Sequence, residues 1–227
     1  MGNPSSVQVA KLVLVLACCA VIARAYSLDP PLQHTGDFGE PNCNESGCHQ
    51  GNAVNASGGS LTLTGVPAQY EPGKTYAITV TINRSAQIRW GFECAVRRAA
   101  NAAQAGNLVA TSSTAHVDSE AGIQYIHHTL AMSGSGPKSW TFNWVAPATA
   151  VGQVRFSCAG NAANGNGLNT GDFIYTTTAT SDPAATQNFT TTLYYPRLVT
   201  SDNEFTGIAV ANLDSSAATL RFTSYDT

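Results

Sequence analysis

The chain has 227 residues, of which 11% are charged and 8% aromatic, and its formal net charge is −3 at pH 7. This length accommodates one good-sized domain and part of another. The acidic balance and the lack of a run of basic residues exclude a typical nucleic-acid-binding surface. Abundant Ser, Thr, Asn, Gly and Ala between short β-branched runs favour strands and turns over helices.

The N-terminus has the pattern of an export signal. A single basic residue, Lys11, precedes the apolar run 12–23, which leads into the small-x-small pattern Ala-Arg-Ala. We predict that residues 1–25 are a signal peptide cleaved after Ala25, and that the mature protein is secreted, periplasmic or at the cell surface. A lipoprotein box ending at Cys18 is the alternative, although apolar residues continue beyond it. The apolar run is too short for a stable membrane span, and no other stretch is long enough.

Residues 26–58 are rich in proline and glycine and show neither a helical nor a strand period, so we predict a loop-rich segment. Residues 59–180 then carry short runs of alternating apolar residues separated by turn signals, ending in an Asn/Gly-rich loop at 160–171 and one more strand. This pattern is typical of a β-sandwich. The predicted strands lie around residues 61–64, 76–82, 88–96, 108–111, 123–130, 140–144, 154–158 and 173–178.

An Ala- and Thr-rich linker, residues 181–189, precedes a β-rich tail, residues 190–227. The tail contains further strand candidates, but it is too short to build a core of its own. We therefore expect an incomplete second β module: a truncated product, a fragment, or a segment that needs a partner strand.

Two of the cysteines lie on predicted core faces. Cys94 alternates with Trp90 and Phe92, and Cys158 alternates with Phe156, so both side chains are expected to point inward. In an oxidising compartment two inward cysteines favour a disulfide, either across the sandwich or between neighbouring strands. Two buried free thiols are the alternative.

The most informative short segment is Cys-Asn-Glu-Ser-Gly-Cys-His, residues 43–49. Covalent attachment of a c-type haem needs two thiols, here Cys43 and Cys48, and a histidine directly after the second, here His49. The usual spacing is Cys-x-x-Cys-His, whereas four residues separate the two cysteines in this chain. Two other interpretations stay open: a small Cys43–Cys48 disulfide ring, and a zinc site built from both cysteines, His49 and His34.

Eight short segments of residues 30–180 form a recognisable set: HTGDFGE (34–40), GSLTL (59–63), YEPGKTY (70–76), RWGF (89–92), YIHHT (125–129), WTF (140–142), GNAANG (160–165) and GDFIY (171–175). With them, residues 30–180 resemble the choice-of-anchor V family, reeler-like β-sandwich proteins exported by bacteria. The resemblance implies an all-β, immunoglobulin-like (reeler-like) sandwich preceded by a haem-motif segment. It also implies haem c held by Cys43 and Cys48, with His49 as an iron ligand, although the family usually has two residues between the cysteines.

The resemblance also indicates a ligand for the other face of the iron. His128 lies in the segment that matches the Tyr-Ile-x-His-Thr pattern of the family, so it is the first candidate. By strand parity it shares a face with Ile126, and the alternative is a histidine packed in the core. The further candidates are His127, His34, Met132 and His116.

Two functions from different classes follow. The first is an exported monohaem c-type cytochrome-like protein, with covalent haem c, that transfers one electron to a redox protein partner in the periplasm or at the cell surface. The second is a non-enzymatic adhesion or matrix β-sandwich that binds a cell-surface component, with Cys43–Cys48 and Cys94–Cys158 disulfides and no haem. We do not expect an enzyme, because Gly-x-Ser-x-Gly, His-Glu-x-x-His and phosphate-loop motifs are missing from the sequence.

Overall fold

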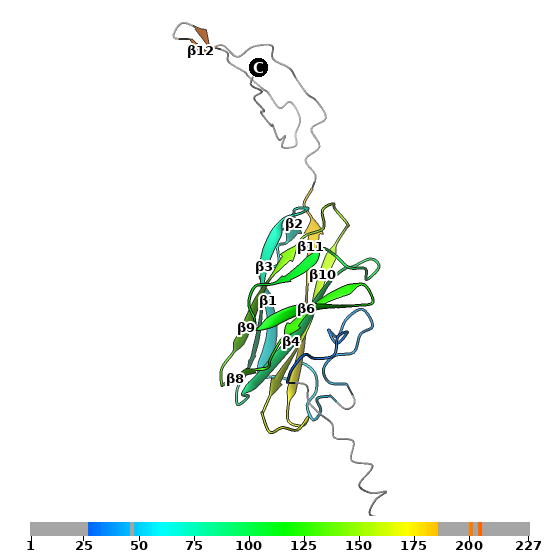
Figure 1. Cartoon of the computed structure of the whole chain (residues 1–227), viewed down its shortest axis with the longest axis vertical. Helices are drawn as coiled ribbons and strands as arrows, with labels where there is room; N and C mark the ends of the chain where they lie inside the picture. The colour runs from blue at the N-terminus through cyan, green and yellow to red at the C-terminus, as the bar shows by residue number, and fades with distance from the viewer. Residues whose placement is uncertain (1–26, 46–47, 186–199, 202–203, 206–227) are drawn as a thin grey trace, which may run out of the picture. The chain divides into compact units, whose positions relative to one another are not determined.

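The protein is described by a computed structural model (Figure 1). The predicted signal peptide, residues 1–25, and nearly all of the predicted tail, residues 190–227, lie outside the described part of the chain. No helix occurs in the described part, which comprises residues 27–45, 48–185, 200–201 and 204–205. Among these residues no helix is long and apolar enough to cross a membrane.

The chain divides into two compact units, Met1–Ala184 and Ala185–Thr227. In the second unit the described residues form one antiparallel pair, β12 (Thr200–Ser201) with β13 (Glu204–Phe205). All other described strands belong to the first unit.

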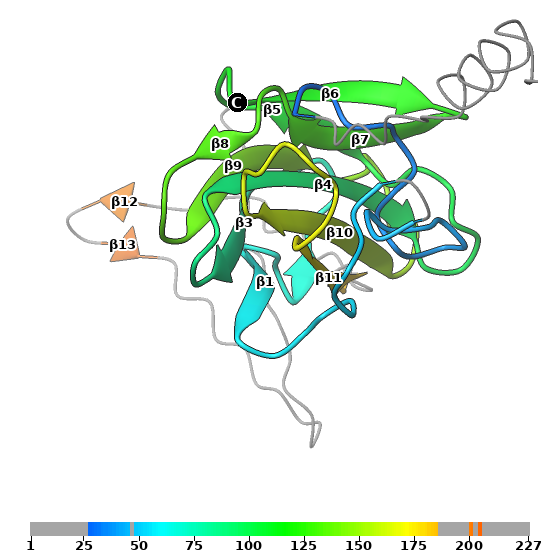
Figure 2. The same cartoon turned by 90° about the horizontal axis from the view of Figure 1, so that it is seen from below.

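The first unit is a sandwich of two sheets (Figure 2). The smaller sheet is antiparallel, in the order β1 (Gly59–Thr64), β3 (Thr75–Arg84), β9 (Lys138–Val145) and β5 (Asn107–Ala110). In the larger, seven-stranded sheet β2 pairs in parallel with β11, and the other pairs are antiparallel. Its order is β2 (Gln69–Tyr70), β11 (Phe173–Pro183), β10 (Val154–Ala163), β4 (Arg89–Arg98), β7 (Ile123–His128) and β6 (Ala115–Glu120), with β8 (Met132–Ser133) also paired to β4.

The strands predicted within residues 59–180 form, but the sequence did not predict every strand. The strands β2, β6 and β8 were not predicted. The predicted loop at 160–171 begins too early, because β10 continues to Ala163 between two long neighbours that supply hydrogen-bond partners on both sides. β11 runs to Pro183, into the segment predicted as a linker.

The core lies between the two sheets and contains alternate residues of each strand, as period-two alternation requires. The smaller sheet contributes Trp140, Phe142 and Trp144, all buried, from β9. The Trp144 indole keeps its polar atom satisfied by donating to the carbonyl of Ala105 at 2.8 Å. Burial of such large aromatic side chains is the main source of stability in a sandwich of this size.

The predicted disulfide is confirmed: Cys94 is bonded to Cys158, and both side chains are buried in the core. The two residues are direct partners in the β4–β10 register, with their Cα atoms 4.1 Å apart. The bond therefore joins neighbouring strands of one sheet rather than the two sheets, and the alternative of two free thiols is wrong. Such a bond is typical of exported proteins.

The loop-rich segment 27–58 packs on the outer face of the seven-stranded sheet and is held there largely by polar contacts. Glu40 accepts hydrogen bonds from the Arg97 guanidinium and the Tyr125 hydroxyl, and the side chains of this Glu40–Arg97 ion pair are each only 8% exposed. Asp37 accepts a hydrogen bond of 2.7 Å from the Ser157 hydroxyl. These contacts fix the segment that carries Cys43, Cys48 and His49 over the sheet.

Candidate functional site

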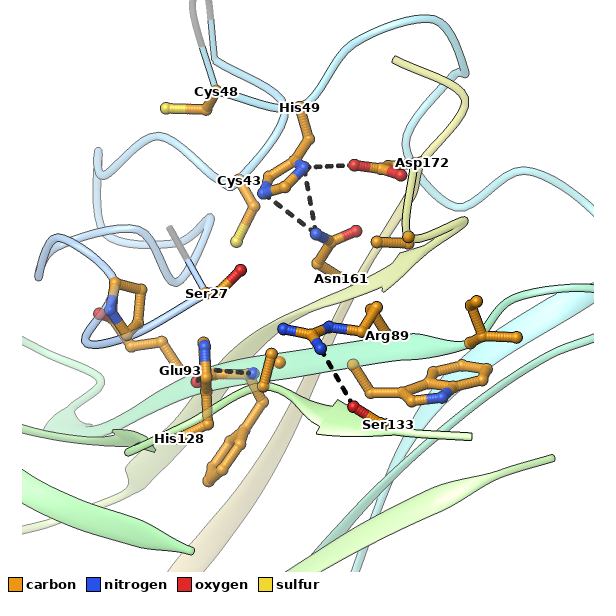
Figure 3. Close-up of a pocket in the computed structure, with 18 of the residues that line it drawn as sticks. Ser27, Cys43, Cys48, His49, Arg89, Glu93, His128, Ser133, Asn161 and Asp172 are labelled. Atoms are coloured by element: carbon orange, nitrogen blue, oxygen red, sulfur yellow. Dashed lines mark hydrogen bonds and ion pairs between the residues drawn. The ribbon is translucent and has the colours of Figure 1, made fainter. Parts of the chain in front are cut away.

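A cavity of about 580 Å³ opens between segment 27–58 and the outer face of the seven-stranded sheet (Figure 3). Its volume lies in the range of about 300–1,000 Å³ that is usual for small-molecule and cofactor sites. The lining brings together all four residues for which the sequence predicted a role in haem binding: Cys43, Cys48, His49 and His128.

The two cysteines and His49 lie on a loop that closes on itself. The amide of Cys48 donates to the carbonyl of Glu45 at 3.0 Å, and the amide of His49 donates to the carbonyl of Cys43 at 3.0 Å. An isolated bridge between Gln50 and Thr170 then joins the end of the loop to the segment before β11. Residues 46 and 47, between the cysteines, lie outside the described residues.

Cys43 and Cys48 are free, half-buried thiols in the structure. Burial, with smaller contributions from the Glu93 carboxylate and Cys48, raises the pKa of the Cys43 thiol to about 12. Burial and the nearby Glu45 also raise the pKa of Cys48. Both groups are therefore neutral thiols at pH 7, a form that is slow to form disulfides and a poor metal ligand.

His49 is oriented by a buried carboxylate. Its Nδ1 lies 2.6 Å from Oδ2 of Asp172, whose other carboxylate oxygen accepts the backbone amide of Asn164 at 3.1 Å. A carboxylate at this distance fixes the proton on Nδ1, and Nε2 then carries a lone pair. The side-chain amide of Asn161 lies 3.0 Å from Nε2 and is its hydrogen-bond donor in this structure.

His128 ends β7, and its ring lies against the backbone of β4. Its Nδ1 is 3.1 Å from the amide and 3.2 Å from the carbonyl of Phe92. The ring needs a glycine beneath it, because a Cβ at Gly91 would come within 2.5 Å of His128 Cε1. Figure 3 shows His49 above and His128 below in the same cavity. His128 is buried, with 5% of its surface exposed, and it also lines the cavity, so the ligand assignment and the packed-histidine alternative both stay predictions.

The Nε2 atom of His128 is buried and has no hydrogen-bond partner in the described part of the chain. Burial lowers the pKa of this imidazole to about 4, so the ring is neutral at pH 7. The Phe92 amide donates to Nδ1, and this contact places the ring proton on Nε2. The other tautomer donates from Nδ1 to the Phe92 carbonyl and leaves the buried Nε2 with a free lone pair, the form that would bind a metal.

The other predicted ligands lie elsewhere or are already engaged. His34 lines the cavity, but its ring binds the Leu32 carbonyl and the Glu45 carboxylate. Met132 packs against the core, and His116 and His127 pair with each other across β6 and β7. The residues of the zinc interpretation all line the cavity, but their donor atoms form no metal-sized cluster among the described residues.

Sequence reasoning missed Glu93, which lies at the centre of β4 and faces the cavity with only 1% of its surface exposed. One carboxylate oxygen accepts the amide of His34 at 2.7 Å, and the other has no partner among the described residues. Burial raises the pKa of this acid to about 8, against the opposing effect of the His34 hydrogen bond. The sequence does carry one signal for Glu93: it is an acidic residue between the apolar Phe92 and Cys94 in a predicted strand.

No family model matches the chain, and no curated protein matches its sequence. Similar solved structures include the reelin-N domain of F-spondin, with a TM-score of 0.44 and 15% identity over 59% of this chain and 92% of that chain. The human F-spondin reeler domain (fragment 1) has a TM-score of 0.41 and 16% identity, over 58% of this chain and 92% of that chain. A cohesin module of a Clostridium perfringens family 33 glycoside hydrolase has a TM-score of 0.39 and 12% identity, over 56% of this chain and 98% of that chain.

The predicted all-β sandwich is confirmed by the two sheets of the chain itself. The resemblance to the choice-of-anchor V family stays a prediction. The roles of Cys43, Cys48, His49 and His128 in haem binding stay predictions too.

Proposed function

We propose that this protein is an exported monohaem c-type cytochrome-like carrier of one electron. The observation that supports this most is the meeting of Cys43, Cys48, His49 and His128 around one cavity. The first three come from a loop and the last from β7, so their convergence is a property of the fold and not of the motif alone.

The donor set of this cavity fits a c-type haem. Cys43 and Cys48 are free thiols, the state from which thioether bonds to vinyl groups form. The Asp172 carboxylate holds Nδ1 of His49 and makes the imidazole a stronger ligand, so Nε2, which the Asn161 amide contacts in this structure, is the atom that would bind the iron in place of that contact. His128 offers its buried, unpartnered Nε2 from the other side.

The remaining lining supports the same proposal. Ile88 and Leu168 line the cavity, yet 47% and 61% of their surfaces are exposed, as expected for apolar side chains that a flat apolar ligand would cover. Arg89 is the one Lys or Arg among the described lining residues and would pair with an anionic group of the ligand. A bound haem supplies the one-electron iron couple, and the protein excludes water and fixes the ligands.

The second candidate is a non-enzymatic adhesion or matrix module. The Cys94–Cys158 disulfide supports it, because a disulfide-bonded sandwich that presents loops to a partner needs no cofactor. This candidate also predicts a Cys43–Cys48 disulfide, whereas the haem proposal predicts two thioether bonds from the same sulfur atoms. The state of these two sulfur atoms in the matured protein therefore separates the two proposals.

The deciding experiment expresses the full chain for export in cells that carry cytochrome c maturation genes. The haem proposal predicts a reduced α-band, haem that stays on the chain in denaturing gels, and a mass increase of one haem. The double variant Cys43→Ser/Cys48→Ser is expected to be colourless but folded, because the core disulfide does not involve these residues.

A colourless wild-type protein whose peptide map contains a Cys43–Cys48 disulfide would overturn the haem proposal and support the adhesion module. His49→Ala and His128→Ala separate the two ligand assignments, because each is expected to alter the spectrum of the bound haem without releasing it from the two thioether bonds.

A further inference from the structure

A second group of potential ligands lies on the same outer face of the sheet, at the β6 edge. His116 and His127 are direct partners in the β6–β7 register, and their ring centroids are 4.1 Å apart. Asp118 follows His116 by two residues on the same face of β6, and Asp29 approaches from segment 27–58. None of these four residues lines the cavity described above.

The donor atoms of this group converge on a small volume. Oδ2 of Asp118 lies 3.0 Å from Nε2 of His116 and 3.3 Å from Nε2 of His127. Oδ1 of Asp29 lies 3.5 Å from Nε2 of His116. Ligands bound at about 2.0–2.2 Å to a tetrahedral ion are about 3.3–3.6 Å apart, so these separations approach those of a metal's coordination shell.

The second ring nitrogens of both histidines face oxygen acceptors. Nδ1 of His127 lies 3.4 Å from the carbonyl of His128, and Nδ1 of His116 lies 3.3 Å from the hydroxyl of Thr129. Metal-bound histidines usually make such a contact through the nitrogen that does not bind the ion. With the protons on Nδ1, both Nε2 lone pairs point at the Asp118 carboxylate.

With both protons on Nδ1, the two lone pairs and the two carboxylates repel each other unless a cation lies between them. The tautomers with the proton on Nε2 donate to Asp118 instead, but they give up donation from Nδ1 to the His128 carbonyl and the Thr129 hydroxyl. Protonation of both rings would supply that charge, but it would place two positive rings against each other, one of them on His127, which is 1% exposed. The donor atoms of Asp29, His116 and His127 all lie within 4.8 Å of one another, and Asp118 contacts both histidines, so a divalent ion at this point would be within reach of these groups.

We propose that His116, His127, Asp118 and Asp29 bind one divalent first-row transition-metal ion, with Zn²⁺ as the expected occupant. Two imidazoles and two carboxylates without a thiolate form a set that Zn²⁺ accepts. Because Asp29 belongs to segment 27–58 and the other ligands to β6 and β7, the ion would tie the start of this segment to the sheet edge. The proposal does not depend on haem binding.

The test is a titration of the mature, chelator-treated protein with Zn²⁺ by calorimetry and with Co²⁺ by visible absorption. We expect one equivalent of either ion, and Co²⁺ d–d bands without a thiolate-to-metal charge-transfer band. His116→Gln and Asp118→Asn alter side chains at least one-third exposed, so folding should survive, and each is expected to weaken Zn²⁺ binding about tenfold or more. Asp182→Asn on β11 is the matched control and should bind as the wild type does.

Three results would overturn the proposal. One is the lack of stoichiometric binding, and another is wild-type affinity in both His116→Gln and Asp118→Asn. The third is a Co²⁺ spectrum with a thiolate band that disappears in Cys43→Ser, which would place the ion at the cysteine loop instead.

Discussion

Glu93 makes the stability of this protein depend on pH in a direction opposite to that of most acidic residues. Burial disfavours the charged form of its carboxyl group and raises the pKa from an ordinary value of 4.5 to about 8 in the folded protein. Below pH 4.5 the acid is protonated in both the folded and the unfolded state and makes no pH-dependent contribution. Between pH 4.5 and 8 the unfolded chain loses the proton and the folded protein keeps it, so stability falls as the pH rises.

The pKa difference sets the magnitude. At about 1.4 kcal/mol for each pKa unit, the shift lowers the free energy of unfolding by about 5 kcal/mol between pH 4 and pH 9. Glu93→Gln removes the ionisation and keeps an oxygen that accepts the amide of His34. We therefore expect the variant and the wild type to be similarly stable near pH 4, and the variant to be more stable by several kcal/mol near pH 9.

Urea unfolding of both proteins at intervals from pH 4 to pH 9 measures this difference. Glu71→Gln is the matched control: Glu71 is exposed and, among the described residues, its carboxylate pairs with Lys74 at the surface, where such a pair contributes little to stability. Parallel stability curves for Glu93→Gln and the wild type across this pH range would refute the reasoning.

Three further predictions concern the sheet and its cover. Gly91→Ala should destabilise the protein by about 1–3 kcal/mol in urea unfolding, because the new methyl group clashes with the adjacent histidine ring of β7. Cys94→Ala/Cys158→Ala removes a bond between residues 64 apart in sequence and should lower the free energy of unfolding by about 4 kcal/mol, measured without reductant. Glu40→Gln leaves the Arg97 guanidinium buried without its carboxylate, at a cost of about 3 kcal/mol, and should speed proteolysis of segment 27–58; an unchanged cleavage rate would contradict this.

Strands with strong alternation could be predicted from sequence because period-two burial is a local property. The pattern of Ile78, Val80 and Ile82 on β3 identifies the inner face without any knowledge of its partner. The same parity placed Cys94 and Cys158 inward, and their bond followed. The strand β6 carries no such pattern, because most of its side chains are partly or fully exposed and its pairing with β7 defines it.

The candidate site likewise contains residues that the local sequence pattern could predict and residues that it could not. The cysteines and His49 are adjacent in sequence, so the motif alone could suggest their chemistry. Asp172 lies 123 residues from His49, and nothing in the local pattern near either residue indicates that they meet. Glu93 is recognisable only as a charge in an apolar strand, and its burial depends on the docking of segment 27–58 over the sheet.

That docking also controls the reactivity of the thiols. In the docked segment burial raises the pKa of Cys43 to about 12 and keeps it a neutral thiol, whereas an exposed cysteine has a pKa of about 8.5 and reacts far more readily as a thiolate. Neither the hydrophobic core between the sheets nor the disulfide includes residues 27–58, so we expect the sandwich to fold before the segment docks. Under the proposed function, thioether formation would therefore be fastest before the segment docks, and docking through Glu40 and Asp37 would then bring His49 and His128 into one cavity.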